Sequence, residues 1–329
     1  MKKTLLTGFT FLFCLVTILG GCAEKPLSDK EKPEIIRVSY NYRPLNLQAL
    51  VGHRQMIFED GYKEDGIVVD WAELENSDII EKMAAAKIDI ATSLDYISAI
   101  LAKAEGEDLK IVANYTAFPG AIGLVAGSGI TGIEQLQGKK VALEAATMNQ
   151  ELLLKALSNQ GMAASQVEIV NKSGSDALNS LLQGEVAGAV LSEPLLGQAL
   201  SDGRFRLISG GEGLTLGQSV IAVRTEFAQK YPGTLRRFLL CAKESRDYLM
   251  ENSLDGVRLA AVKNEISQEE VIRIMPKFSF QLSISKDFRS RLKETAAFLQ
   301  SQGFIKPDLN ISNLVNDLVD TSFLPLIAK

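Results

Sequence analysis

Hydrophobic residues along this chain follow two alternating spacings. Short runs rich in Val and Ile are separated by longer stretches in which apolar residues recur three and four positions apart. The first spacing is typical of buried β-strands and the second of amphipathic helices. The pattern predicts strands at 35–40, 67–71, 88–91, 109–113, 141–143, 167–170, 187–191, 206–208 and 219–223.

Helices are expected between these strands. The intervening segments with helical spacing are 47–58, 77–86, 96–104, 149–160 and 175–183, and the chain from 232 onward reads as mainly helical, at 232–250, 253–262, 267–274 and 286–302. A strand that is regularly followed by a helix indicates βαβ units. The fold class is therefore α/β, with a largely parallel sheet.

The first 22 residues have the pattern of a secretory signal peptide. Lys2 and Lys3 precede an apolar run at 5–18, and small residues lead to Cys22. The sequence LGGC at 19–22 resembles the bacterial lipobox, which implies cleavage before Cys22 and lipidation of its thiol; an ordinary signal with an incidental cysteine is the alternative. Residues 23–34 are polar and contain two prolines, so we expect a flexible tether. The protein is then lipid-anchored on the extracytoplasmic face of the cell membrane, in the periplasm or at the cell surface.

Composition excludes several function classes. The hydrophobic fraction of 46% and charged fraction of 23% are those of a globular protein, and a net charge of -5 without a long Lys/Arg run argues against a nucleic-acid partner. The single histidine, His53, and three cysteines cannot supply a zinc cluster. A Ser-His-Asp hydrolase would depend on His53 alone. We expect no metal, no cofactor and no catalytic residue, and Cys241 as a small buried hydrophobe.

The order of several short motifs resembles a known family. The matching stretches are IVVDW at 67–71, KIDIA at 87–91, LQGKKVA at 136–142, GEVAGA at 184–189 followed by Glu193-Pro194, and 223–232. Together they are similar to the type II periplasmic binding proteins, in the NMT1-like branch that serves ABC importers of nitrate, sulfonates, taurine and thiamine precursors. The resemblance covers about 35–320.

The resemblance implies two α/β lobes joined by a hinge of two crossing segments. Lobe one is expected at 35–125 and 218–329, and lobe two at 126–217. The crossings are expected near 124–127 and 213–218, where glycines could absorb a rotation of the lobes. A monomer is the family expectation.

Candidate ligand-binding residues follow from where loops leave the strands. In open parallel sheets, ligands bind beyond the carboxyl ends of the strands, close to helix N-termini. The candidates are Tyr42, Arg43, Ser93, Leu94, Asp95, Thr147, Met148, Asn149, Glu193 and Gln218. Alternative roles stay open: Ser93 and Thr147 as helix N-caps, Arg43 as a surface ion-pair partner, Glu193 as an interlobe support and Met148 as core. Leu94 and the pair Ala146-Thr147 stand where many relatives carry glycine or Gly-Ser, and the mixture of Arg43 with carboxylates allows an anion, a zwitterion or a cation.

The function implied is solute capture. Such a protein binds a small polar molecule between its lobes and delivers it to an ABC permease in the membrane, without catalysis. Two alternatives remain at this point: a ligand-sensing lipoprotein that reports to a membrane signalling partner, and an enzyme on the same fold.

Overall fold

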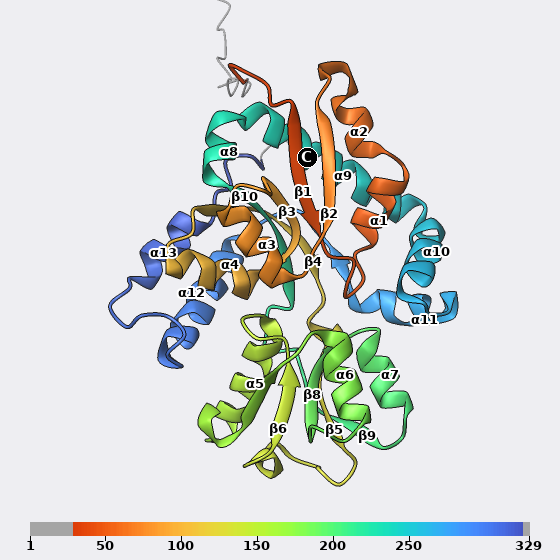
Figure 1. The fold of residues 1–329 in the computed structure, drawn as a ribbon, viewed down its shortest axis with the longest axis vertical. Helices are drawn as coiled ribbons and strands as arrows, with labels where there is room; N and C mark the ends of the chain where they lie inside the picture. Colours follow the sequence, from red (N-terminus) through yellow and green to blue (C-terminus); the bar gives the residue numbers. More distant parts are fainter. Residues whose placement is uncertain (1–28, 325–329) are drawn as a thin grey trace, which may run out of the picture.

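The computed structural model describes residues 29–324, which form two lobes stacked end to end (Figure 1). Lobe one is built on a six-stranded sheet in the order β11-β4-β10-β3-β1-β2. Its strands are β1 (Ile35–Tyr40), β2 (Val68–Glu73), β3 (Ile90–Asp95), β4 (Leu109–Ala117), β10 (Gln218–Arg224) and β11 (Ser279–Phe280).

Lobe two has a five-stranded sheet in the order β7-β6-β8-β5-β9. Its strands are β5 (Ile122–Gly127), β6 (Lys140–Leu143), β7 (Glu168–Asn171), β8 (Gly188–Ser192) and β9 (Phe205–Gly210). The strands of the βαβ units are parallel, but β10 in lobe one and β5 in lobe two run antiparallel to their neighbours. Both sheets are therefore mixed, because the strand that enters each lobe from the other one arrives in the opposite direction.

Helices cover both faces of each sheet. In lobe one and its C-terminal extension they are α1 (Leu47–Arg54), α2 (Ile57–Tyr62), α3 (Asn76–Ala84), α4 (Tyr96–Glu105), α8 (Thr225–Lys230), α9 (Pro232–Glu251), α10 (Ser253–Asn264), α11 (Gln268–Ile274), α12 (Lys286–Ser301) and α13 (Ile311–Leu318). In lobe two they are α5 (Met148–Asn159), α6 (Gly174–Leu182) and α7 (Leu195–Ser201). No helix in the described part of the chain is long and apolar enough to cross a membrane.

The helix expected at 47–58 is two helices. Met56 has a left-handed backbone (φ 55°), which ends the regular turn between α1 and α2. The break lets Phe58 on α2 pack against Phe238 on α9, with ring centroids 4.8 Å apart. Cys241 follows on the same buried face of α9 as a free cysteine, which confirms the expectation of a small buried hydrophobe.

Two segments connect the lobes, at 118–121 between β4 and β5 and at 211–217 between β9 and β10. The first lies before the expected 124–127, because β5 pairs along its whole length within the sheet of lobe two. The boundary expected at 125/126 therefore falls inside a strand. The segments touch: Phe118 N–H donates to Gly217 O at 2.7 Å.

Residues 29–34 lie against lobe one. The Asp29 carboxylate accepts hydrogen bonds from the backbone N–H groups of Gly233 (2.6 Å) and Thr234 (2.8 Å) in the first turn of α9. A carboxylate at this position satisfies free N–H groups and is stabilised by the helix dipole. The flexible tether expected over 23–34 does not extend to Asp29, because these contacts attach that residue to the lobe.

Gly217 is predicted to be sensitive to substitution. A Cβ at this position would lie 2.5 Å from backbone atoms of Pro119, and φ is +52°. Gly213 also has a positive φ (+76°), but a Cβ there meets nothing within 4 Å. We expect Gly213→Ala to cost about 1–2 kcal/mol of unfolding free energy from backbone strain, and Gly217→Ala about 1–3 kcal/mol more from overpacking. Urea denaturation of both variants measures the difference, and equal losses would contradict it.

Candidate functional site

A cavity lies between the lobes, at the carboxyl ends of strands from both sheets. Lobe one contributes the loop after β1, the end of β3 and the start of α3; lobe two contributes the loops after β6 and β8. The cavity is lined by Asn41, Arg43, Pro44, Leu45, Asn46, Glu75, Asn76, Ser93, Asp95, Thr116, Phe118, Glu144, Thr147, Met148, Asn149, Gly174, Ser192, Glu193, Pro194, Leu195, Ser219 and Phe278. This is the place where α/β sheets bind ligands.

Seven of the ten candidate residues line this cavity. They are Arg43, Ser93, Asp95, Thr147, Met148, Asn149 and Glu193. Leu94 is instead fully buried in the lobe-one core, because it points to the face of β3 opposite to its neighbours. Gln218 and Tyr42 do not line the cavity either. The Gln218 side chain donates to Thr116 O and Ser219 O, and the Tyr42 ring makes cation–π contacts with Arg43 (5.0 Å) and Lys263 (4.6 Å).

Arg43 reaches from lobe one to lobe two. Its Nη1 atom donates to Ser175 Oγ in the first turn of α6 at 2.7 Å, and its guanidinium stacks over the Tyr42 ring at 5.0 Å. Asn41 Oδ1 accepts from the Arg43 N–H at 2.9 Å and shapes the loop. Within residues 29–324 no carboxylate forms an ion pair with Arg43, so its positive charge is available to an anionic group.

Asp95 joins the lobes through both of its oxygens. Oδ1 accepts from Ile97 N–H at 2.7 Å and caps α4, while Oδ2 accepts from Met148 N–H, at the start of α5 in lobe two, at 2.9 Å. The residue is 4% exposed. Burial raises the pKa of Asp95 to about 8 despite the two N–H donors, which act in the opposite direction.

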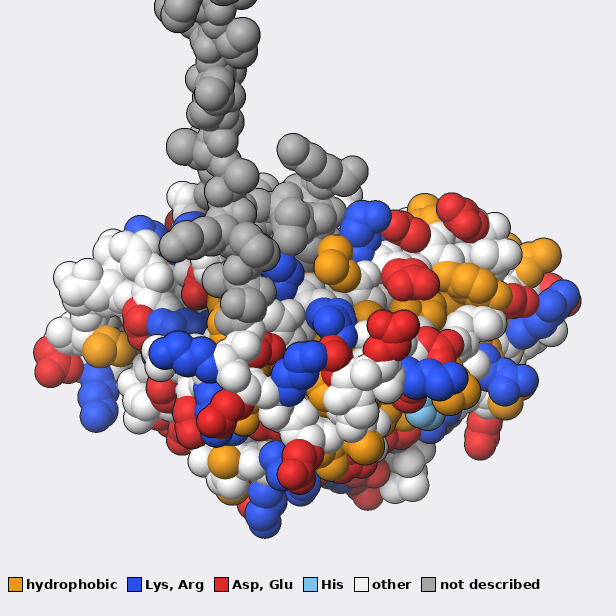
Figure 2. Space-filling model, turned by 90° about the horizontal axis from the view of Figure 1, so that it is seen from above, with side chains coloured by type: hydrophobic (Ala, Val, Ile, Leu, Met, Phe, Trp, Pro, Cys, Tyr) orange, Lys and Arg blue, Asp and Glu red, His pale blue; other side chains and the backbone are white. Residues whose placement is uncertain are grey.

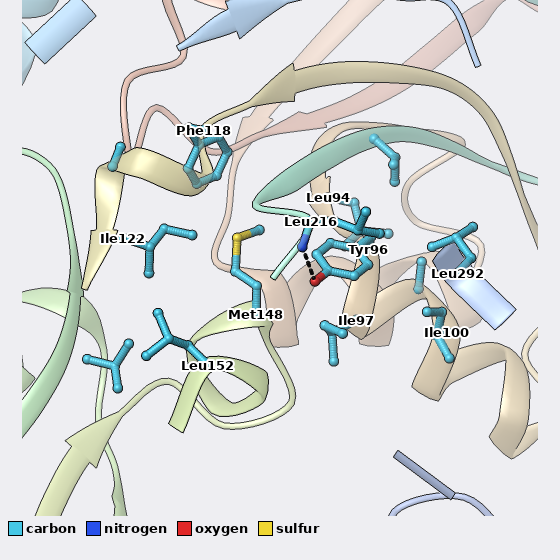
Figure 3. Packing of buried hydrophobic residues seen from close by; sticks show 14 of the residues in the cluster. Leu94, Tyr96, Ile97, Ile100, Phe118, Ile122, Met148, Leu152, Leu216 and Leu292 are labelled. Atoms are coloured by element: carbon cyan, nitrogen blue, oxygen red, sulfur yellow. Dashed lines mark hydrogen bonds between the residues drawn. The ribbon is translucent and has the colours of Figure 1, made fainter. Parts of the chain in front are cut away.

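Three of the other candidates have clear local roles. Thr147 is the N-cap of α5, accepting from Asn149 N–H at 3.3 Å. Ser93 is not an N-cap; its hydroxyl accepts from Asn41 N–H at 3.1 Å and so attaches the loop after β1 to β3. Met148 packs with Phe118 and residues of both lobes as an apolar wall (Figure 3).

Glu193 is 2% exposed and supports the interface between the lobes. Oε2 accepts from Gly197 N–H at 3.0 Å, and Oε1 forms an ion pair with Lys277, from lobe one, at 2.6 Å. Arg273 lies further out, 3.9 Å from the same oxygen. The geometry of Glu193 matches the alternative role as a support between the lobes, because both of its carboxylate oxygens already have partners within the protein.

A second buried connection lies at α5. Glu151 is fully buried and accepts from Tyr96 OH on α4, from Thr295 Oγ1 on α12 at 2.9 Å, and from Lys155 at 2.7 Å. Tyr96 OH in turn accepts from Leu216 N–H of the second crossing at 3.1 Å (Figure 3). Lobe two is thus bonded to lobe one and to the crossing in one network.

The sequence interpretation missed two carboxylates in the cavity, Glu75 and Glu144. Glu75 precedes α3 in lobe one and accepts from Asn41 Nδ2 at 2.9 Å; Glu144 follows β6 in lobe two and accepts from Asn76 Nδ2 at 3.4 Å. Burial, and next the charge of Glu75, raise the pKa of Glu144 to about 7. The position of Glu144 directly after a strand was the available signal. No set of side chains arranged to hold a metal ion occurs in 29–324.

A family model described as NMT1/THI5 like matches residues 59–253, more than half of the chain. The chain belongs to this family. A putative aliphatic sulfonates-binding protein of Bacillus subtilis is 26% identical over 98% of this chain and 96% of its own length. The taurine-binding periplasmic protein of Escherichia coli is 26% identical over 58% of this chain and 60% of its own length. These relatives are binding proteins of transport systems and not enzymes.

Solved structures of sulfonate-binding proteins share the two-lobed fold. The alkanesulfonate-binding protein of Xanthomonas axonopodis pv. citri, bound to MOPS, superposes with a TM-score of 0.80 over 89% of this chain and 100% of its own, at 18% identity. The aliphatic sulphonate binding protein of Escherichia coli gives 0.73 over 86% and 92%, at 19% identity. The fold of this family member is therefore that of a type II periplasmic binding protein, with two mixed sheets.

The raised pKa of Glu144 predicts a pH dependence of stability. Because the folded state holds this proton more tightly than the unfolded state, whose pKa is near 4.5, the unfolding free energy falls as pH rises from about 4.5 to about 7. We expect Glu144→Gln to remove on the order of 2 kcal/mol of this fall, measured by urea denaturation between pH 5 and 8.

Glu185→Gln is the matched control. Hydrogen bonds from Ser180 and Lys172 lower the pKa of Glu185, so its contribution is lost only in more acidic solution. This variant should keep the wild-type slope between pH 5 and 7. Parallel curves for Glu144→Gln and the wild type would contradict the assignment.

Proposed function

We propose that this protein is the solute-binding component of an ABC importer, and that it captures a small polar solute of the sulfonate, taurine or nitrate class between its lobes. The observation that carries the proposal is the interlobe cavity, in which seven residues expected from strand ends of both lobes converge. The family match and the names of the relatives support the transport role.

Ligand capture would act by closing the lobes. A solute in the cavity contacts both lobes, so it binds the closed arrangement better and shifts the population toward it. Arg43 supplies the positive charge for an anionic group, and α6 presents its N-terminus beside it through Ser175. The closed form would then dock on the permease and release the solute there.

The proposal includes lipidation at Cys22, after removal of residues 1–21. These residues lie outside the part of the chain that the structure describes. Asp29 is attached to the first turn of α9, and the described chain begins at the end of lobe one remote from lobe two (Figure 1). A membrane anchor on this side would leave the interlobe cavity accessible to solutes.

Solute capture predicts ligand-dependent stabilisation. A solute at 100 times its Kd should add about 2.7 kcal/mol to the unfolding free energy and raise the Tm by several degrees. Thermal-shift measurements on the chain from 23 onward should test alkanesulfonates, taurine, nitrate, amino acids, polyamines and pyrimidine precursors. We expect Arg43→Ala to abolish the shift for an anionic ligand, and Arg258→Ala, on the surface of α10 and paired with Asp255, to leave it unchanged. A shift that survives Arg43→Ala would contradict the role of this residue.

If Cys22 carries a lipid, substitution of this cysteine should change the cell fraction in which the protein is found. We expect Cys22→Ser to abolish incorporation of labelled palmitate and to move the protein out of the membrane fraction of the cells. Cys14→Ser, within the signal peptide, should leave both labelling and fractionation unchanged. A wild-type chain without label would show that the segment is an ordinary secretory signal.

A further inference from the structure

The charge of the cavity does not match a purely anionic solute. On the outer end of lobe one, basic and acidic side chains are interspersed (Figure 2). The lining of the cavity is mainly acidic by comparison: among the described residues that line it are four acidic ones, Glu75, Asp95, Glu144 and Glu193, and one basic one, Arg43. A sulfonate or nitrate ion, which offers only negatively charged oxygen acceptors, would face four carboxyl groups there.

Two of the four carboxyl groups already have hydrogen-bonding or ion-pair partners within the protein. Glu193 is paired with Lys277, and Asp95 accepts two backbone N–H groups. Glu75 and Glu144 each accept one amide N–H, from Asn41 and Asn76, and neither forms an ion pair within residues 29–324. They come from opposite lobes, so closing the cleft brings two carboxylates to one cavity. Two like charges close together oppose closure unless a cation lies between them or one of them binds a proton.

A third group in the cavity also requires a donor. Asn149 lines the cavity and is 8% exposed, and its Oδ1 atom is buried without a hydrogen-bond partner in the described chain. A buried acceptor left without a donor costs about 1–3 kcal/mol. The oxygens of a sulfonate or nitrate cannot supply the missing N–H group. Asn149, Glu75 and Glu144 are thus three acceptors, from two lobes, that share one cavity.

We propose that the solute of this protein carries a cationic nitrogen, an ammonium or amidinium group, which binds between Glu75 and Glu144 and donates to Asn149 Oδ1. Arg43 then holds an anionic group of the same molecule, so the ligand is a zwitterion. This inference rests on the proposed function and narrows it from sulfonates in general to amino-substituted acids. The cation neutralises the repulsion between the lobes, which makes closure dependent on the nitrogen and not on the anionic group alone.

Matched ligand pairs separate the contribution of the nitrogen. Each pair has the same acid and chain length but carries an amine or a hydroxyl: taurine and isethionate, 3-aminopropanesulfonate and 3-hydroxypropanesulfonate, β-alanine and 3-hydroxypropionate. Titration calorimetry at pH 7.5 should show at least one amino acid of this set binding tenfold or more tightly than its hydroxyl partner. Glu144→Gln should remove that preference, so that the amino and hydroxyl members of the pair bind with similar affinity.

A second measurement needs no ligand. Glu75→Lys supplies an ammonium group at the cavity from the chain itself, and should make the unliganded protein more compact in small-angle scattering and raise its Tm. Asp78→Lys is the control, because Asp78 is an exposed residue of α3, the helix that Glu75 precedes, does not line the cavity and undergoes the same change of charge. This control should leave the radius of gyration unchanged.

The outcomes distinguish the inference from the proposed function. If hydroxyl and amino members bind equally tightly, the protein is a sulfonate or carboxylate binder and the cation site is wrong. If no member of any pair binds, the solute class of the proposed function is contradicted, and Glu75→Lys decides the inference: a compaction supports the cation site, and its absence overturns it.

Discussion

The arrangement of the cleft depends on the Asp95 carboxylate. Asp95 is the last residue of β3, and one of its oxygens caps α4. The other oxygen accepts a hydrogen bond from the first N–H group of α5, in the opposite lobe. A buried carboxylate without donors and a helix N-terminus without acceptors are both costly, so each lobe satisfies the other when the cleft is closed. Glu151 repeats this arrangement deeper in the interface, where Tyr96 also binds the second crossing. The lobes therefore meet at defined polar contacts, which fix the shape of the cavity between them.

Within a cavity of this shape, the side chains of the lining loops determine which ligand can bind. The fold is shared with sulfonate-binding proteins at 18–19% identity, which transfers architecture but not the lining of the cavity. In this chain Arg43 lines the cavity together with the hydrogen-bond acceptors of Glu75, Glu144 and Asn149. The position of the two glutamates on opposite lobes couples their charge to closure, so the same groups that would select a solute would also control the conformational change.

Much of the fold could be predicted, and less of the site. The alternation of strand and helix spacing located the strands of both sheets except β5 and β11. Strand-end loops identified residues that line one cavity: Arg43, Ser93, Asp95, Thr147, Met148, Asn149 and Glu193. Leu94 and Gln218 were placed wrongly with respect to the cavity lining, because the face to which a strand residue points depends on register. Glu75 was missed because the strand expected at 67–71 extends to Glu73, which places Glu75 in the short loop between β2 and α3. Phe278 lies in the helical C-terminal part, where no pattern marks a cavity wall.

The sequence alone determined the local elements, the α/β class and the set of loops from which a site could be built, because hydrophobic spacing and helix caps are properties of short segments. The tertiary structure decided where the chain crosses between lobes: β5 belongs to the second sheet by its pairing with β8 and β9, which no local pattern encodes. It also decided which polar groups are already satisfied within the protein. Asp95 and Glu193 have partners supplied by the other lobe, whereas Glu144 faces Glu75, and these are contacts between residues 50 or more positions apart.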